Sequence, residues 1–151
     1  MFFSTIGYEG VSIGDFISFL RQNDVKIVAD VRLVPFSRKK GFSKKKMKEY
    51  LDQCDINYKH FPLLGCPAFI RNQYKISGDW EVYRKQYLSY LEENISAIDE
   101  LIPYLDIYRL ALMCFESDYN RCHRIFIGQA IENRYKGHKM SHLVPHKPFL
   151  C

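Results

Sequence analysis

Hydrophobic and polar residues are arranged along the chain in two ways, as short apolar runs and as stretches with helical spacing. Three apolar runs of strand length predict buried strands at Phe2–Tyr8, Lys26–Arg32 and Arg109–Phe115. The last run, RLALMCF, is apolar on both faces, which is typical of a central strand in a parallel sheet. Two weaker patterns, at Tyr58–Pro62 and Met140–Val144, complete the predicted strands.

Helical spacing fills most of the intervals between these strands. A helix is predicted from Ser12, because an acidic residue three positions later forms a capping-box pattern. Apolar residues recur at helical spacing in residues 47–54, 79–103 and 123–133, which predicts three further helices. Residues 62–78 are interrupted by Gly and Pro, so this segment is predicted to be irregular.

The alternation of strands and helices predicts the α/β class: a single domain with a mostly parallel sheet, flanked by helices on both faces. The domain is expected to cover residues 1–151, since 151 residues and 17.9 kDa fit one domain of ordinary size. No apolar run approaches the ~18 residues needed to span a bilayer. The first ten residues, MFFSTIGYEG, do not resemble a secretion signal, so the expected location is the cytoplasm, with no membrane partner.

The positive charge of the chain is concentrated in one segment. The net charge is +5, and seven basic residues but no acidic one lie between Arg38 and Lys48. Without these seven, 15 basic residues face 17 acidic ones, so the excess is local. Such a segment attracts phosphates through Coulomb forces and counterion release. The alternative is a solvated helix start and loop.

Polar side chains follow three of the predicted strands at the point where each strand ends. In open α/β sheets, ligands bind beyond the carboxyl ends of the strands, so these side chains are expected to form one site. The predicted ligand-binding residues are Gly7, Tyr8, Asp30, Arg32, Ser37, Arg38, Cys114 and Arg124. The predicted catalytic residues are Cys122, His123 and Glu116.

The thiols are the first candidate chemistry. An odd number of cysteines does not suggest a disulfide framework, so free thiols are expected at Cys54, Cys66, Cys114, Cys122 and Cys151. Cys122 lies at a predicted helix start, flanked by Arg121, His123 and Arg124, which favours its thiolate. Cys114 lies in the apolar strand and is expected to be a core residue. For Cys122, a core role is the alternative to the reactive thiolate.

A metal site is the second candidate chemistry. Structural zinc sites usually use tight pairs such as C-x₂-C, and the chain has none. A scattered set still offers four possible ligands, with Glu116 nearby: Cys114, Cys122, His123 and His142. No metal ligand is assigned on this spacing.

Anion recognition is the third candidate. Arginine can hold phosphate or carboxylate through two parallel hydrogen bonds, and Arg32, Arg38 and Arg124 are expected on one rim. Arg71, in the segment predicted to be irregular, would close over the site. The competing interpretation of Arg32 is a pairing with Asp30 or Glu116, and the pairing with Asp30 is geometrically reasonable because side chains two apart on a strand share a face.

Several motifs, taken together, resemble the DUF488 family of small bacterial and archaeal proteins. They are TIGYEG, DVR followed by PFSRKKGFSKKKM, LLGCP, ALMCFE and CHR, which extend the resemblance from about Thr5 to His142. The resemblance implies an α/β fold and an unassigned biochemical function. The residues that match are Gly7, Tyr8, Asp30, Arg32, Pro35, Ser37, Phe42, Gly65, Cys114, Glu116, Cys122, His123 and Arg124.

A more distant likeness is to rhodanese domains. There, as here, a strand ending in DVR precedes a later apolar strand that ends in a cysteine and leads into a helix. Cys114 would occupy the position of the catalytic cysteine. The following segment, FESDYNR, departs from rhodanese loops because it is acidic and contains no glycine.

The sequence therefore predicts an enzyme-like pocket with thiols that binds a phosphate-bearing ligand, either a nucleotide or a nucleic acid. The first alternative is a non-catalytic nucleic-acid binding module, in which the segment from Arg38 to Lys48 matters and the thiols do not. The second alternative is a metal-binding protein. Neither a cofactor nor a reaction is indicated.

Overall fold

A five-stranded, all-parallel sheet forms the centre of the molecule, for which the computed structural model describes residues 2–145. Its strands are β1 (Phe2–Gly7), β2 (Ile27–Asp30), β3 (Asn57–His60), β4 (Leu110–Cys114) and β5 (Lys139–Leu143). They lie in the order β3-β2-β4-β1-β5, so β4 is central as its apolar sequence predicts. Because all strands are parallel, their carboxyl ends lie at one edge of the sheet.

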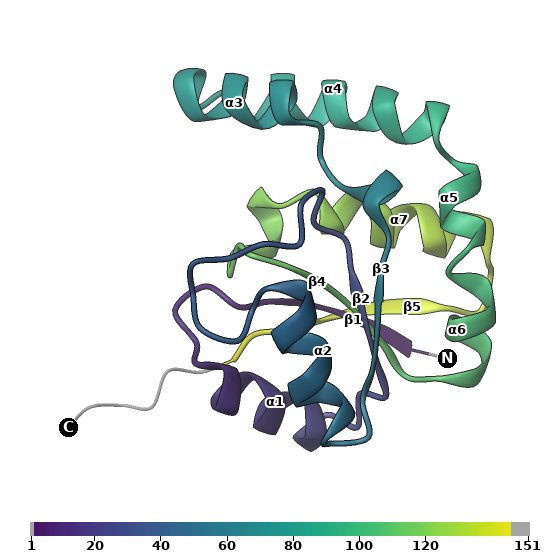
Figure 1. Cartoon of the computed structure of the whole chain (residues 1–151). Coiled ribbons are helices and arrows are strands. Elements are labelled where there is room, and N and C mark those ends of the chain that lie inside the picture. Colours follow the sequence, from purple (N-terminus) through teal and green to yellow (C-terminus); the bar gives the residue numbers. More distant parts are fainter. Residues whose placement is uncertain (1, 146–151) are drawn as a thin grey trace.

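Helices cover both faces of the sheet (Figure 1). One face is covered by α1 (Ile13–Gln22) and α2 (Lys44–Asp52). The other face carries the remaining elements: η1 (Pro62–Leu64), α3 (Ala68–Ser77), α4 (Trp80–Glu93), α5 (Ser96–Asp99), α6 (Ile102–Ile107), η2 (Tyr119–Arg121) and α7 (Arg124–Arg134). The predicted α/β architecture, with helices on both faces, is confirmed. Within residues 2–145, none of the helices combines the length and hydrophobicity needed to cross a membrane.

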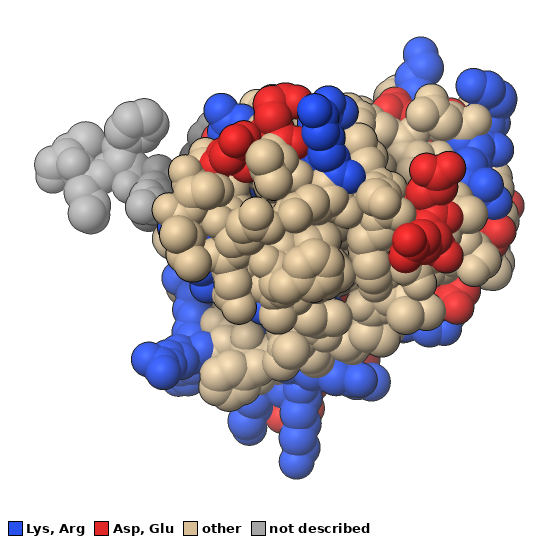
Figure 2. Space-filling view, turned by 90° about the horizontal axis from the view of Figure 1, so that it is seen from above, with Lys and Arg blue, Asp and Glu red and all other residues tan. Residues whose placement is uncertain are grey.

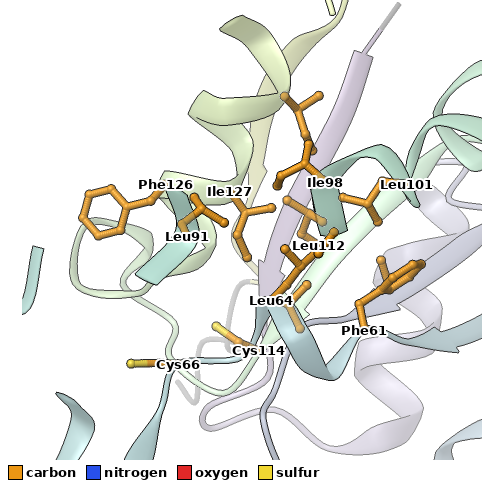
Figure 3. Close-up of a cluster of buried hydrophobic side chains, with 14 of the residues drawn as sticks. Phe61, Leu64, Cys66, Leu91, Ile98, Leu101, Leu112, Cys114, Phe126 and Ile127 are labelled. Carbon is orange, nitrogen blue, oxygen red and sulfur yellow. The ribbon is translucent and has the colours of Figure 1, made fainter. Parts of the chain in front are cut away.

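The sheet separates two hydrophobic cores, and alternate residues of each strand enter opposite cores. In β4, Leu112 and Cys114 pack with α4 and α7, whereas Ala111 and Met113 pack with α1 and α2. Figure 3 shows the first of these cores, with Cys114 and Cys66 at one end of the cluster. This alternation places the end of β4 beside the larger group of helices.

The predicted irregular segment at residues 62–78 is wrong, because most of it forms η1 and α3. Its Pro and Gly residues stand at the ends of η1 and α3, and none lies inside α3. Pro67 is the N-cap, and Gly78 is the C-cap with a left-handed backbone at φ 68°. Such punctuation therefore delimits a ten-residue helix.

The continuous helix predicted over residues 79–103 is also wrong, because α4, α5 and α6 divide this stretch. The chain leaves α4 at Asn94, whose side chain donates a hydrogen bond to the Tyr90 carbonyl at 2.9 Å. Pro103 lies in the first turn of α6, where its missing N–H leaves no bond unmade. The predicted start of α1 is confirmed, since the Ser12 hydroxyl accepts a hydrogen bond from the Asp15 backbone N–H.

Candidate functional site

A pocket of about 360 Å³ lies at the carboxyl edge of the sheet. Its floor follows β1, β2 and β4, and its wall comes from α3 and α4. The lining residues are Tyr8, Arg32, Leu33, Val34, Phe36, Ser37, Cys66, Arg71, Lys75, Tyr83, Cys114, Phe115, Glu116 and His123. A second hollow of about 290 Å³ shares Arg71, Lys75, Tyr83 and Glu116 with it, so the two form one depression. The strand ends therefore meet where the sequence predicts a site.

Asp30 and Arg32 form a buried ion pair beneath the pocket. Arg32 donates from Nε to Asp30 Oδ1 at 2.9 Å and from Nη2 to Oδ2 at 2.7 Å. Its Nη1 donates to the Tyr8 hydroxyl at 3.0 Å and to the Phe42 carbonyl at 2.6 Å. Burial works to lower the pKa of Arg32, but the bonds to Asp30 more than offset this, so the pKa is raised.

These contacts occupy four of the five donors of the guanidinium. The pairing of Arg32 with Asp30, the alternative interpretation from the sequence, is the arrangement that the structure has. Tyr58 adds a further hydrogen bond from its hydroxyl to Asp30. Burial, and then the Asp30 charge, raise the pKa of Tyr58. Arg32 thus fixes the pocket floor and has one donor left for a ligand.

Arg124 lies against the sulfur of Cys114. Its side chain is 1% exposed, and its Nη1 donates to Cys114 Sγ at 2.9 Å and to the Glu116 carbonyl at 2.5 Å. A buried guanidinium needs an anionic partner. Within residues 2–145, no carboxylate forms a hydrogen bond with Arg124, and the negative charges that act on it through space are those of Glu116 and Asp118. Burial lowers the pKa of Arg124 to about 10, which leaves it charged near neutral pH.

Cys114 and Cys122 face each other across the loop between β4 and α7, and their sulfur atoms are in contact. Their Cα atoms are 7.8 Å apart, which is wider than the roughly 4.4–6.8 Å of disulfides. The structure joins Cys114 and Cys122 as a disulfide, so the free thiols expected from the sequence at these two positions are corrected, while Cys54 and Cys66 are free. The expected thiol at Cys151 lies outside the described residues.

His123 is held as one tautomer. Its Nε2 lies 2.7 Å from the Val31 carbonyl oxygen, which can only accept, so Nε2 carries the proton. The lone pair of Nδ1 therefore points towards Cys122 Sγ, 3.7 Å away. Burial lowers the pKa of His123 to about 4, and the positive charge of Arg124 adds to this. The ring is neutral near pH 7, with a free nitrogen directed at sulfur.

Glu116 is directed at the pocket by the close approach of its backbone to β1. A Cβ atom at Gly7 would overlap the Glu116 carbonyl oxygen, so only glycine lets the loop lie this near. Glu116 Oε2 accepts a hydrogen bond from Cys114 Sγ at 3.3 Å. Burial raises the pKa of Glu116. The carboxyl group and the thiol are therefore neighbouring acids at the floor of the pocket.

Two cations on α3 stand at the mouth of the pocket. Arg71 and Lys75 are four residues apart on one face of the helix, and both are exposed. Neither has a hydrogen bond or an ion pair from its side chain within residues 2–145. The positive charge of Arg71 lowers the pKa of Glu116 and of His123, which shows that it faces the floor.

The structure brings together six of the predicted site residues as pocket lining, namely Tyr8, Arg32, Ser37, Cys114, Glu116 and His123. Gly7, Asp30, Arg124 and Cys122 are buried around them and do not line the pocket. Arg38 is exposed and does not line it either. His142 is placed elsewhere, because its Nδ1 lies 2.6 Å from Thr5 Oγ1 and its ring stacks on Tyr119.

From the sequence, the side chains of Arg121 and Arg124 are expected beside Cys122, but the structure places both elsewhere. Arg121, expected beside Cys122, is exposed and lies over the Trp80 ring at 5.5 Å. Arg124, from the same expectation, contacts Cys114. Seven lining residues were missed as site residues: Leu33, Val34, Phe36, Cys66, Lys75, Tyr83 and Phe115. The spacing of Arg71 and Lys75 would have indicated a shared helix face, but only once α3 was recognised as a helix.

Comparison with known proteins gives one match. The family model described as "Domain of unknown function DUF488" matches residues 12–131, which is most of the chain. No curated protein and no solved structure matches. The likeness to rhodanese domains stays a prediction. The motifs, the α/β fold and the family model agree, and the chain belongs to the DUF488 family.

Proposed function

We propose that the pocket binds a phosphate-bearing small molecule of nucleotide size and presents it to the thiol, imidazole and carboxyl groups of the floor. The observation that carries this proposal is the pair of unpartnered cations, Arg71 and Lys75, over a pocket of about 360 Å³. Exposed cations that face an enclosed hollow hold a phosphate through charge-assisted hydrogen bonds. The hydroxyl of Ser37 lies on the opposite rim and can donate to the same anion.

Aromatic rings at the rim support a ligand with a planar group. Phe36 and Phe115 line the pocket, and 66% and 46% of their surfaces are exposed. Phe115 packs edge-on against Tyr8 with ring centroids 5.5 Å apart, which leaves part of its surface to solvent. A nucleobase laid over these rings would remove apolar area from water and gain stacking energy.

The floor supplies candidates for chemistry on such a ligand. Cys114, Glu116 and His123 all line the pocket, and Cys122 lies directly behind them. Once the Cys114–Cys122 pair is reduced, a thiol next to Arg124, a neutral imidazole and a carboxyl group of raised pKa are groups that can carry nucleophilic or acid–base steps. The activity is therefore proposed to reside at this floor, and recognition on α3.

The test is equilibrium binding of a nucleoside monophosphate, with the corresponding nucleoside as the comparison, measured by calorimetry. Arg71→Gln and Lys75→Gln should each weaken binding of the monophosphate about tenfold or more, because a hydrogen bond to a charged group contributes about 1.5–3 kcal/mol. Lys85→Gln is the matched control, since Lys85 is exposed on α4 and does not line this pocket. Equal binding of nucleoside and monophosphate, or unchanged binding by both variants, would refute the proposal.

A second candidate function, nucleic-acid binding, is favoured by the basic segment. Of its seven cations, the described residues pair only Lys46 with Glu49 and Lys48 with Asp52. The segment also begins next to the pocket, at the end of the β2–α2 loop. Figure 2, which views the molecule from above, shows a largely uncharged central face with both basic and acidic residues at its margins.

Fluorescence anisotropy with a labelled oligonucleotide tests this candidate. Replacing Lys44, Lys45 and Lys46 with Ala should weaken binding of all sequences alike. The slope of log affinity against log salt should fall in magnitude by roughly 2 to 3, at about 0.7–0.9 per phosphate contact. Binding that is insensitive to salt between about 50 and 200 mM, or absent at the lower concentration, would assign the segment to solvation only.

A further inference from the structure

We propose that Cys114, Cys122 and His123 bind a thiophilic divalent cation, expected to be zinc, behind the floor of the pocket. The inference rests on the pocket of the proposed function and adds a site that the sequence did not assign. The two Sγ atoms and one imidazole nitrogen all lie within 4.8 Å of one another, and all three residues are buried. Three soft or borderline donors that converge in this way are a ligand set for zinc.

The geometry of His123 is that of a ligand already oriented. Its Nε2 donates to the Val31 carbonyl, and this second contact fixes the ring and leaves Nδ1 for a metal. The distance from Nδ1 to Cys122 Sγ is 3.7 Å. Zinc bonds of about 2.0–2.3 Å at tetrahedral angles would separate a nitrogen and a sulfur ligand by roughly 3.6 Å. The pair therefore needs little movement to hold an ion.

The spacing of the two cysteines favours an ion over a disulfide. Their Cα atoms, 7.8 Å apart, would have to approach for an unstrained S–S bond. Two thiolates bound to one zinc ion at about 2.3 Å each lie roughly 3.8 Å apart, so after reduction the two sulfurs, which are in contact here, would separate while the Cα spacing is kept. On binding M²⁺, each cysteine that is still a thiol releases its proton to solvent, and no oxidant or reductant is needed.

The charges around the cluster suit a bound dication. Two thiolates neutralise M²⁺, and the positive charge of Arg124, whose Nη1 donates to the Glu116 backbone carbonyl, is offset through space by the charges of Glu116 and Asp118. The Arg124 contact with Cys114 Sγ is the kind of outer hydrogen bond that orients a metal thiolate. Without a bound cation, the only positive charge in contact with the sulfurs of Cys114 and Cys122 among the described residues is the Arg124 guanidinium.

Three protein ligands leave a fourth position of a tetrahedral ion open. Cys114 and His123 line the pocket, so this position faces the cavity where the phosphate-bearing ligand is proposed to bind. Glu116 Oε2, 3.3 Å from Cys114 Sγ, stands next to it. Zinc sites with three protein ligands and one open position are typical of catalytic zinc, which polarises a bound oxygen.

Cobalt(II) is the spectroscopic probe for this site. The full chain, reduced and stripped of metal, should bind about one equivalent of Co²⁺ and develop sulfur-to-cobalt charge-transfer absorption, which Zn²⁺ then abolishes. Cys114→Ser, Cys122→Ser and His123→Asn should each lose or greatly weaken this absorption. Cys54→Ser is the matched control and should keep it, because Cys54 is a free, half-buried cysteine outside the cluster.

Two results would overturn the proposal: no thiolate–cobalt absorption in the reduced wild-type protein, or equal loss of it in Cys54→Ser. A third set of results would assign the pair to a disulfide. Without reductant, the protein would have a mass lower by two hydrogens and both cysteines would resist alkylation. After reduction, it would take up no metal. If circular dichroism shows that the ligand variants do not fold, zinc-loaded wild-type protein is treated with a thiol reagent instead. Release of zinc supports the site, and retention of zinc contradicts it.

The same variants separate this inference from the proposed function. Metal-free wild-type protein should still bind the nucleoside monophosphate, because Arg71 and Lys75, which carry that binding, lie outside the metal cluster. Arg71→Gln should lose monophosphate binding and keep the cobalt spectrum. Cobalt absorption therefore tests the metal site, and binding of the nucleoside monophosphate tests the proposed function, each independently of the other.

Discussion

Replacing Arg32 by Met tests how much the fold depends on the ion pair beneath the pocket. Asp30 is fully buried, and Arg32 is 7% exposed. The substitution removes two side-chain hydrogen bonds to Asp30, at 2.9 and 2.7 Å, and keeps an apolar side chain of similar length. Asp30 retains the backbone N–H of position 32 and the Tyr58 hydroxyl as donors. Its charge is then buried without a counterion.

The expected loss in free energy of unfolding is about 3–5 kcal/mol, the usual cost of removing one partner of a buried ion pair. Domains of this size have about 5–15 kcal/mol in total, so the variant stays folded but loses a large share of its stability. With a urea m-value of about 2 kcal/mol/M, the transition midpoint should fall by roughly 2 M.

Urea titration followed by tryptophan fluorescence measures this loss. The chain has one tryptophan, Trp80, which stacks on Tyr83 with ring centroids 4.6 Å apart and therefore reports the packing of α4. Asp52→Asn is the matched control, since it breaks the half-exposed ion pair with Lys48. That change should stay within about 0.5 kcal/mol of wild type.

A double-mutant cycle separates the ion pair from the shape of the site. Asp30→Asn combined with Arg32→Met removes both charges, so the double variant should be more stable than the sum of the two single losses predicts, by at least about 1 kcal/mol. A loss below about 1 kcal/mol in Arg32→Met, or strict additivity in the cycle, would refute the view that Arg32 is primarily a structural partner of Asp30.

Three further predictions use variants or labelling of single residues. Gly7→Ala should lower the free energy of unfolding in urea by about 1–3 kcal/mol, since its Cβ would meet the Glu116 carbonyl. Gly14→Ala, with open space around its Cβ, should raise it by about 0.5–1 kcal/mol. Equal effects of the two substitutions would contradict this. Tyr58→Phe should be less stable than wild type near neutral pH. Because the folded pKa of Tyr58 is raised above its ordinary value of 10.0, its contribution is fully present below that value and is lost progressively as pH rises beyond it towards the folded pKa, so the gap in urea midpoint should narrow above pH 10.0. Burial raises the pKa of Cys66 to about 11, so iodoacetamide at neutral pH should label the half-buried Cys54 first in peptide mass spectra, and the opposite order would refute this.

The sequence predicted the sheet and the position of the site because both follow from local patterns. The run at β4 is apolar at every position, and such a run in an alternating chain forms a central strand. The polar residues after β2 and β4 meet because parallel strands end at one edge. The segment at α3 was missed because its Pro and Gly were taken as breaks, although they cap the helix at both ends.

The partners of the site residues could not be predicted in the same way, because they depend on contacts between distant segments. The Phe42 carbonyl, which occupies a donor of Arg32, reaches it only when the β2–α2 loop folds back over Tyr8. Arg124 follows Cys122 closely in sequence but turns to Cys114. A pattern of charges shows which groups are near a site and leaves open which atoms they bond.

The division of the pocket between two structural layers has a consequence for how its selectivity can diverge in evolution. Its floor comes from strand ends and the β4–α7 loop, where Gly7 and the Asp30–Arg32 pair tie the site residues to the sheet. Its cations stand on α3, an exposed helix that packs on α4 above the sheet (Figure 1). On the proposed function, exchanging residues on the outer face of α3 would alter the recognised ligand without disturbing either core. Relatives with the same floor would then be free to bind different ligands.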